Sequence, residues 1–174
     1  MKTSQTKTAL IIGGGSGMGR AVALELCRCG IQVFIADVDL SAAGETVQAA
    51  EGYPGKAEAL RVDVSNSSSV KSLFAGLKQR VERLDLLVHA AAVLGQTVFI
   101  EQMDDQEWRQ MMMVNLDGAF YCCREAVGWM KLHENGRIIL FSSVAALTPT
   151  PGAVHYSAAK GGINMLGKSL AKEV

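Results

Sequence analysis

Short runs of apolar residues recur along the chain and alternate with segments that have a helical repeat. The clearest runs cover residues 9–12, 33–36, 84–88 and 138–141, and a weaker run covers 59–62. Apolar character without alternation is typical of strands that are buried on both faces of a sheet. The five runs therefore predict five parallel strands, since parallel sheets carry helices on both faces.

Two of the intervening segments have distinct helix signals. One apolar stripe has the spacing i, i+3, i+4, i+7 and i+11, and consists of Val70, Leu73, Phe74, Leu77 and Val81. Asp104 and Glu107 have the spacing of a capping box, which predicts that a long helix begins there and runs toward His133. The alternation of strands and helices predicts an α/β fold, a doubly wound parallel sheet.

Length, composition and charge narrow the class of protein. A chain of 174 residues suggests a single domain, and 49% hydrophobic with 20% charged residues is ordinary for a soluble protein. The 17 basic residues are balanced by 17 acidic ones, so neither a nucleic-acid partner nor a membrane partner is indicated. The apolar run 9–12 is too short for a signal peptide, and no run is as long as a membrane span. We therefore expect a cytoplasmic protein.

The cysteines and histidines do not have the spacing of a metal site. The cysteines are Cys27, Cys29, Cys122 and Cys123, and no pair of them has the spacing C-x-x-C. We expect them to be small buried hydrophobic residues. The histidines are His89, His133 and His155, which are scattered along the chain. We predict no metal.

A glycine-rich segment, GGGSGMG, follows the first apolar run directly and precedes a helical pattern. Glycine lets the backbone turn sharply and approach a pyrophosphate, whose charge the helix N-terminus stabilises. A glycine run alone can also be a flexible turn, but its place between a strand and a helix favours a dinucleotide-binding loop. The predicted cofactor contacts in this loop are Gly13, Ser16, Gly17, Met18 and Gly19.

Asp37 ends the second apolar run. A carboxylate at this point of a dinucleotide-binding fold accepts hydrogen bonds from the adenosine ribose and repels a 2′-phosphate. The alternative is a solvated loop residue without a ligand. Together with the glycine loop, Asp37 predicts NAD rather than NADP as the cofactor.

Near the end of the chain, Tyr156 is followed four residues later by Lys160, which places both side chains on one face of a helix. A phenol beside an ammonium group can donate and accept a proton, because the positive charge favours the phenolate. Taken alone, such a pair can also be a surface contact.

The ordered set of motifs resembles the short-chain dehydrogenase/reductase family across the whole chain. The family's loop T-G-x-x-x-G-x-G matches residues 12–19 except that Ile12 replaces the threonine, and its Y-x-x-x-K matches Tyr156 to Lys160. The family's adenine-contacting Asp-Val corresponds to Asp63 and Val64.

The resemblance also covers the remaining catalytic positions. The family's catalytic asparagine corresponds to Asn115, and the spacing to the tyrosine selects Ser143 rather than Ser142 as its catalytic serine. The family's N-N-A-G corresponds to His89, Ala90, Ala91 and Ala92, which departs from it at three positions. We expect His89 to be a structural residue. An alanine at position 92 would be strained if that position required a positive φ.

The resemblance implies a Rossmann-like NAD-binding domain over residues 1–174 with strand order 3-2-1-4-5. It implies a catalytic set of Asn115, Ser143, Tyr156 and Lys160. The cofactor would contact Ala90, Ala91, Asp63, Val64, Tyr156 and Lys160 in addition to the glycine loop and Asp37. The substrate would be an alcohol or ketone, and the protein would form a homo-dimer or homo-tetramer through its long helices.

Members of the family continue beyond the helix that carries the tyrosine, into further strands. Here the helical pattern KSLAKEV reaches Val174 without a glycine or asparagine cap, so we interpret the chain as truncated relative to the family. Three interpretations remain: an NAD-dependent oxidoreductase, a dinucleotide-binding module without turnover, and a subunit-interaction fragment. We expect run 138–141 to be an open sheet edge through which these residues associate, with weak NAD binding and poor turnover.

Overall fold

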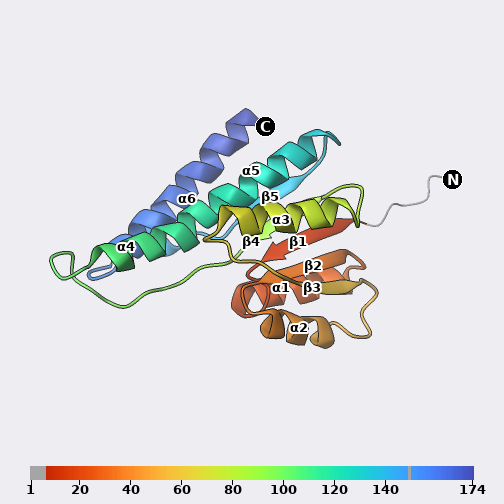
Figure 1. Ribbon diagram of the computed structural model, residues 1–174, viewed down its shortest axis with the longest axis horizontal. Coiled ribbons are helices and arrows are strands. Elements are labelled where there is room, and N and C mark those ends of the chain that lie inside the picture. The colour runs from red at the N-terminus through yellow and green to blue at the C-terminus, as the bar shows by residue number, and fades with distance from the viewer. Residues whose placement is uncertain (1–6, 149) are drawn as a thin grey trace.

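Five strands form one parallel sheet in the computed structural model, which describes residues 7–148 and 150–174 (Figure 1). The strands are β1 (Thr8–Ile12), β2 (Gln32–Asp37), β3 (Ala57–Arg61), β4 (Leu86–His89) and β5 (Arg137–Leu140). Their order is β3-β2-β1-β4-β5, and each neighbouring pair is parallel. The predicted fold class and strand order are confirmed. Residues 1–6, which precede the apolar run that was considered for a signal peptide, lie outside the described residues.

Helices follow the strands in alternation. They are α1 (Gly17–Arg28), α2 (Leu40–Ala49), α3 (Ser67–Lys78), α4 (Asp105–Met112), α5 (Gly118–Lys131) and α6 (Val154–Glu173), with a π-helical segment η1 (Met113–Asp117) and a 3₁₀ turn η2 (Val144–Ala146). The carboxylate of Asp104 accepts a hydrogen bond of 2.7 Å from the Glu107 backbone N–H, which confirms the predicted start of the long helix. That helix is continuous from α4 through η1 to α5 (Figure 1).

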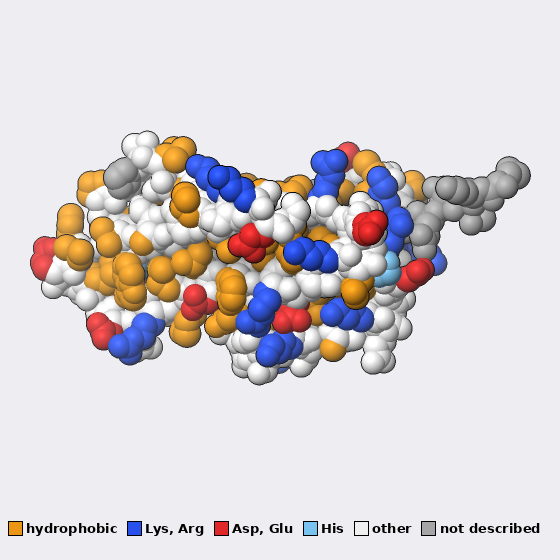
Figure 2. Space-filling model, turned by 90° about the horizontal axis from the view of Figure 1, so that it is seen from above, with side chains coloured by type: hydrophobic (Ala, Val, Ile, Leu, Met, Phe, Trp, Pro, Cys, Tyr) orange, Lys and Arg blue, Asp and Glu red, His pale blue; other side chains and the backbone are white. Residues whose placement is uncertain are grey.

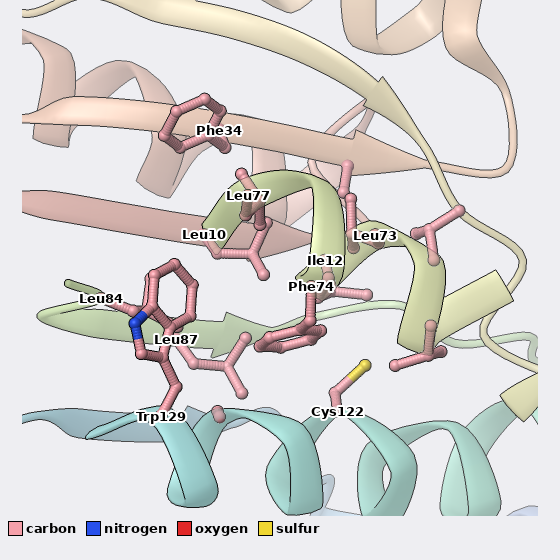
Figure 3. Packing of buried hydrophobic residues seen from close by; sticks show 14 of the residues in the cluster. Leu10, Ile12, Phe34, Leu73, Phe74, Leu77, Leu84, Leu87, Cys122 and Trp129 are labelled. Carbon is pink, nitrogen blue, oxygen red and sulfur yellow. The ribbon is translucent and has the colours of Figure 1, made fainter. Parts of the chain in front are cut away.

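The core has two layers because side chains alternate between the faces of a strand. Leu10 and Ile12 of β1 pack with α3 and α5 on one face, where Phe74 and Trp129 are also buried (Figure 3). Ala9 and Ile11 of β1 pack on the opposite face with residues of α1 and α2. The predicted stripe of α3 supplies Val70, Leu73, Phe74 and Leu77 to the first layer. Val81 lies beyond the end of α3 and packs against the same layer.

Two predictions about burial are only partly correct. β1, β2 and β4 are buried on both faces, but β3 and β5 lie at the edges of the sheet, and Ile139 of β5 is 48% exposed. A continuous apolar run therefore does not by itself distinguish an edge strand from a central one. Three of the cysteines are buried as expected, whereas Cys29 at the end of α1 is exposed.

Candidate active site

The carboxyl ends of β1 and β4 mark the switch point at which open parallel sheets have their ligand-binding crevice, because the chain leaves these neighbouring strands toward opposite faces of the sheet. In an open parallel sheet, ligands bind at this switch point. The glycine loop follows β1, residues 90–104 follow β4, and residues 141–153 follow β5. The fold therefore brings together three segments that are distant in sequence.

The glycine loop packs too closely for larger residues. Gly13 has φ +80°, and a Cβ atom there would collide with the backbone of Ala91. A Cβ atom on Gly19 would collide with the carbonyl oxygen of Gly13. Ser16, Gly17 and Met18 are exposed at the N-terminus of α1. An exposed helix N-terminus of this kind favours a negatively charged group such as a phosphate.

Asp37 lies at the end of β2 and contacts the glycine loop directly. Its Oδ2 accepts a hydrogen bond of 2.9 Å from the Gly15 backbone N–H, and its Oδ1 accepts one of 3.1 Å from Asp39 N–H. A carboxylate has about four acceptor positions, so both oxygens can still accept from ribose hydroxyls. Asp37 thus has a structural contact that sequence reasoning missed.

The predicted adenine-side pair follows β3. The Oδ1 atom of Asp63 accepts hydrogen bonds from the backbone N–H and the hydroxyl of Ser65, at 3.0 and 2.6 Å. Val64 is buried and lies against Gly118 at the start of α5. Asp63 is exposed, whereas Val64 is buried.

The segment after β4 is free of positive-φ strain at Ala92. The Ala90 backbone N–H donates a hydrogen bond of 2.8 Å to Ile12, which places Ala90 and Ala91 against the glycine loop. Ala92 does not have a positive φ; among the described residues other than glycine, only Glu134 does. Replacing the family glycine by Ala92 therefore introduces no backbone strain.

His89 is buried at the end of β4, with 1% of its surface exposed. Its backbone oxygen accepts a hydrogen bond of 3.0 Å from Phe141 N–H, so it joins β4 to the segment after β5. Its Nε2 atom is without a hydrogen-bond partner in the described part of the chain. Burial, and secondly the charge of Lys160, lowers the pKa of His89 to about 4. The imidazole is therefore neutral at neutral pH.

Tyr156 and Lys160 lie side by side on α6, as the spacing predicts. The Lys160 Nζ atom is 5.8 Å from the centre of the Tyr156 ring. Lys160 is buried, with 3% exposed, and its ammonium donates a hydrogen bond of 2.9 Å to the carbonyl oxygen of Phe141. Burial lowers the pKa of Lys160. Tyr156 is half-buried.

The two serines after β5 have different contacts. The Ser142 hydroxyl donates a hydrogen bond of 3.0 Å to the backbone oxygen of Lys160 and thus ties this loop to α6. The Ser143 hydroxyl accepts a hydrogen bond of 3.2 Å from Ala145 N–H at the start of η2. Ser143 keeps its own O–H available as a donor, whereas that of Ser142 is already engaged.

Asn115 is fully buried within the π-helical segment η1. Its side-chain amide accepts from Val93 N–H and donates to the Val93 carbonyl oxygen, both at 2.8 Å. Its Nδ2 atom also lies 2.9 Å from the sulfur of Met111. π-Helical turns occur frequently at functional sites, and here the turn aims the amide at the loop after β4. The sequence contains no signal for this turn.

The structure brings some of the predicted residues together and leaves others without direct contact. Tyr156 and Lys160 are adjacent, and Lys160 is joined through Phe141 to His89. Among the described residues, no hydrogen bond joins Ser143 to Tyr156 or Asn115 to Lys160. Asn115 instead fixes the loop that flanks the crevice.

A separate groove of about 840 Å³ lies between α5, α6 and β5. Its lining is mostly apolar and includes Met130, Leu140, Ile163 and Leu170, but none of the four candidate catalytic residues. This groove therefore lies apart from the candidate catalytic residues. No cluster of three possible metal ligands occurs among residues 7–148 and 150–174. Within the same residues, no helix has the length and apolar character to cross a membrane.

Comparison with known proteins identifies the family. The family model described as short chain dehydrogenase matches residues 7–174. The chain belongs to the short-chain dehydrogenase family, whose members use nicotinamide cofactors. The resemblance seen in the sequence is thereby confirmed.

The chain is similar to relatives that are named for different substrates. A 3beta-hydroxysteroid dehydrogenase of Mediterraneibacter gnavus is 36% identical over 165 residues, which cover 95% of this chain and 59% of the relative. The 3-oxoacyl-[acyl-carrier-protein] reductase FabG of Thermotoga maritima is 31% identical over 168 residues, covering 97% of this chain and 68% of the relative. The crystal structure of gox2181 superposes with a TM-score of 0.92 at 28% identity, and the match covers 97% of this chain and 66% of that one. The chain thus spans between 59% and 68% of the length of these three proteins.

Proposed function

We propose that this chain binds NAD(H) in the crevice between β1 and β4 and serves an oxidoreductase that interconverts an alcohol and a ketone. The observation that carries the proposal is the Tyr156–Lys160 pair, which lies at the same edge of the sheet as the glycine loop. A surface pair would not need a buried lysine, yet Lys160 is 3% exposed and anchored to Phe141.

Several residues would hold the cofactor. The closely packed glycine loop would receive the pyrophosphate, and Asp37 would accept from the adenosine ribose and disfavour NADP. A nicotinamide bound in the crevice would supply the hydride acceptor or donor. The backbone at Ala90 and Ala91 approaches the glycine loop closely enough to form the other side of this cradle.

The proposed proton chemistry belongs to the residues of α6 and the loop after β5. In alcohol oxidation, the Tyr156 oxygen takes the hydroxyl proton as the hydride leaves the adjoining carbon; in reduction it returns that proton. The Lys160 ammonium favours the phenolate, and the Ser143 hydroxyl orients the substrate oxygen by a hydrogen bond. Asn115 holds the Val93 backbone through its side-chain amide, so its role in the proposal is to position the loop after β4.

The test is a titration with NADH, followed by turnover assays of secondary alcohols and ketones. The panel should include a 3β-hydroxysteroid and a 3-oxoacyl thioester, which are the substrate classes named for the relatives. Saturable NADH binding and turnover that Tyr156→Phe removes would support the proposal. NADH binding without turnover of any substrate would favour the dinucleotide-binding module, and the absence of NADH binding would refute both functions.

We also propose that the helix formed by α4, η1 and α5 is the surface for self-association. Its exposed apolar side chains include Trp108 (39% exposed), Met113 (42%) and Phe120 (45%). Figure 2 shows hydrophobic side chains gathered toward the end of the molecule that carries α4 in Figure 1. Sedimentation of Phe120→Ser, with Leu132→Ser as a control in the turn after α5, tests this surface. The Phe120 change should shift the protein toward monomer, and equal sedimentation of both variants would contradict the assignment.

A further inference from the structure

A threonine of α2 reaches into the glycine loop. Thr46 is fully buried, and its hydroxyl oxygen lies 3.0 Å from the carbonyl oxygen of Gly14. The carbonyl oxygens of Ala42 and Gly15 are farther away, at 3.2 and 3.4 Å. A hydroxyl has a single proton to donate, and the shortest of these contacts leads to Gly14. Thr46 therefore bonds to the glycine loop in preference to the preceding turn of its own helix.

The same peptide unit is held from its other side. The carbonyl of Gly14 and the N–H of Gly15 belong to one planar peptide group. Asp37 Oδ2 accepts a hydrogen bond of 2.9 Å from that N–H, while Thr46 donates to the carbonyl. Asp37 and Thr46 therefore clamp a single peptide plane, one at each end of its dipole.

This peptide plane needs such a clamp because glycine lies on both of its sides. Rotating a peptide plane changes ψ of the preceding residue and φ of the next one, and glycine resists neither change sterically. The charged acceptor and the buried hydroxyl select one orientation. The direction of this plane decides which backbone groups the loop presents to a phosphate.

We propose that Thr46 is a positioning residue for the cofactor: it fixes the Gly14–Gly15 peptide and thereby the course of the loop that receives the pyrophosphate. This inference rests on the proposed binding of a dinucleotide at the glycine loop. The affinity of the loop for the cofactor then depends on a residue of α2. Among the described hydrogen bonds of Thr46, none reaches the exposed residues 16–18.

Three variants separate the hydroxyl from other effects of substitution. Thr46→Val keeps the shape and removes the donor, and Thr46→Ser keeps the donor and removes a methyl group. Thr8→Val is the matched control, because Thr8 is also buried (4% exposed) but lies at the opposite end of β1. Thr46→Val should weaken NADH binding by up to about tenfold, if the whole contribution of one hydrogen bond is lost from the bound state. Thr46→Ser should stay within about threefold of the unchanged protein, and Thr8→Val should bind as tightly as it.

Two further readouts distinguish positioning from a general loss of structure. In Thr46→Val, KM for NADH should rise while kcat with saturating NADH changes little. The Gly15 amide should exchange its hydrogen faster in Thr46→Val than in Thr46→Ser. Equal NADH affinity and equal Gly15 exchange in these two variants would overturn the inference. If the unchanged protein fails to bind NADH, the proposed function fails, whereas the exchange of the Gly15 amide still decides whether the clamp exists.

Discussion

Lowering the pH should destabilise the fold through His89. The imidazole is buried on β4, a strand that pairs with β1 and β5. Its Nε2 atom is among the buried groups without a described partner, and its pKa is about 4. An unfolded histidine has a pKa near 6.5. Between these two values the unfolded chain binds a proton that the folded chain does not.

The size of the effect follows from the two pKa values. Each pKa unit corresponds to about 1.4 kcal/mol, so the lowering of the pKa to about 4 corresponds to roughly 3 kcal/mol. Because the unfolded state binds more protons, the free energy of unfolding rises with pH in this window. The titration of His89 therefore leaves the free energy of unfolding unchanged above pH 6.5 and lowers it as the pH falls from 6.5 toward 4.

The assay is urea denaturation at several pH values between 7.5 and 4.5. His89→Asn replaces the imidazole by an amide that does not titrate, and all other groups are shared by the two proteins. The difference in unfolding free energy, unchanged protein minus His89→Asn, should fall by roughly 2–3 kcal/mol across this range. His133→Asn, in the turn after α5, is the control for replacing a histidine outside the sheet. Parallel pH curves for the unchanged protein and His89→Asn would refute the reasoning.

Other predictions concern the cofactor, the chemistry and the loop after β4. Asp37→Ala should narrow the preference for NADH over NADPH, and it should also weaken the binding of NADH because Asp37 holds the glycine loop. Titration with both cofactors measures this, and equal binding of both by the unchanged chain would contradict it. Tyr156→Phe should remove most turnover but leave NADH affinity nearly intact, whereas Lys160→Ala should reduce both turnover and NADH affinity. Undiminished rates in Tyr156→Phe would exclude Tyr156 as the proposed acid/base residue. Asn115→Leu should cost roughly 3 kcal/mol in urea denaturation, because it leaves two backbone groups of the loop unpaired; an unchanged midpoint would show that water replaces the amide.

Sequence patterns predicted the parts of the site that depend on local order. Glycine at positions 13 and 19 follows from the strand–turn–helix context, and both positions exclude a side chain in the structure. The Tyr156–Lys160 pair follows from helical spacing alone, and the two side chains are adjacent. The burial of Lys160 and its bond to Phe141 had no signal in the sequence, because they depend on the approach of α6 to β5.

The sequence by itself determined the alternation of strands and helices, because apolar runs are readable along the chain. Together with the family resemblance, the order of the motifs also determined the order of the strands in the sheet. Only the tertiary structure decided which polar groups meet. Thr46 reaches Gly14, Asp37 reaches Gly15, and Asn115 reaches Val93, and each pair is separated by twenty or more residues. Hydrogen bonds of this kind need positions set to within about half an ångström. Such positions arise only when the helices pack onto the sheet, because periodicity specifies the face that a residue occupies and packing specifies the atom that it touches.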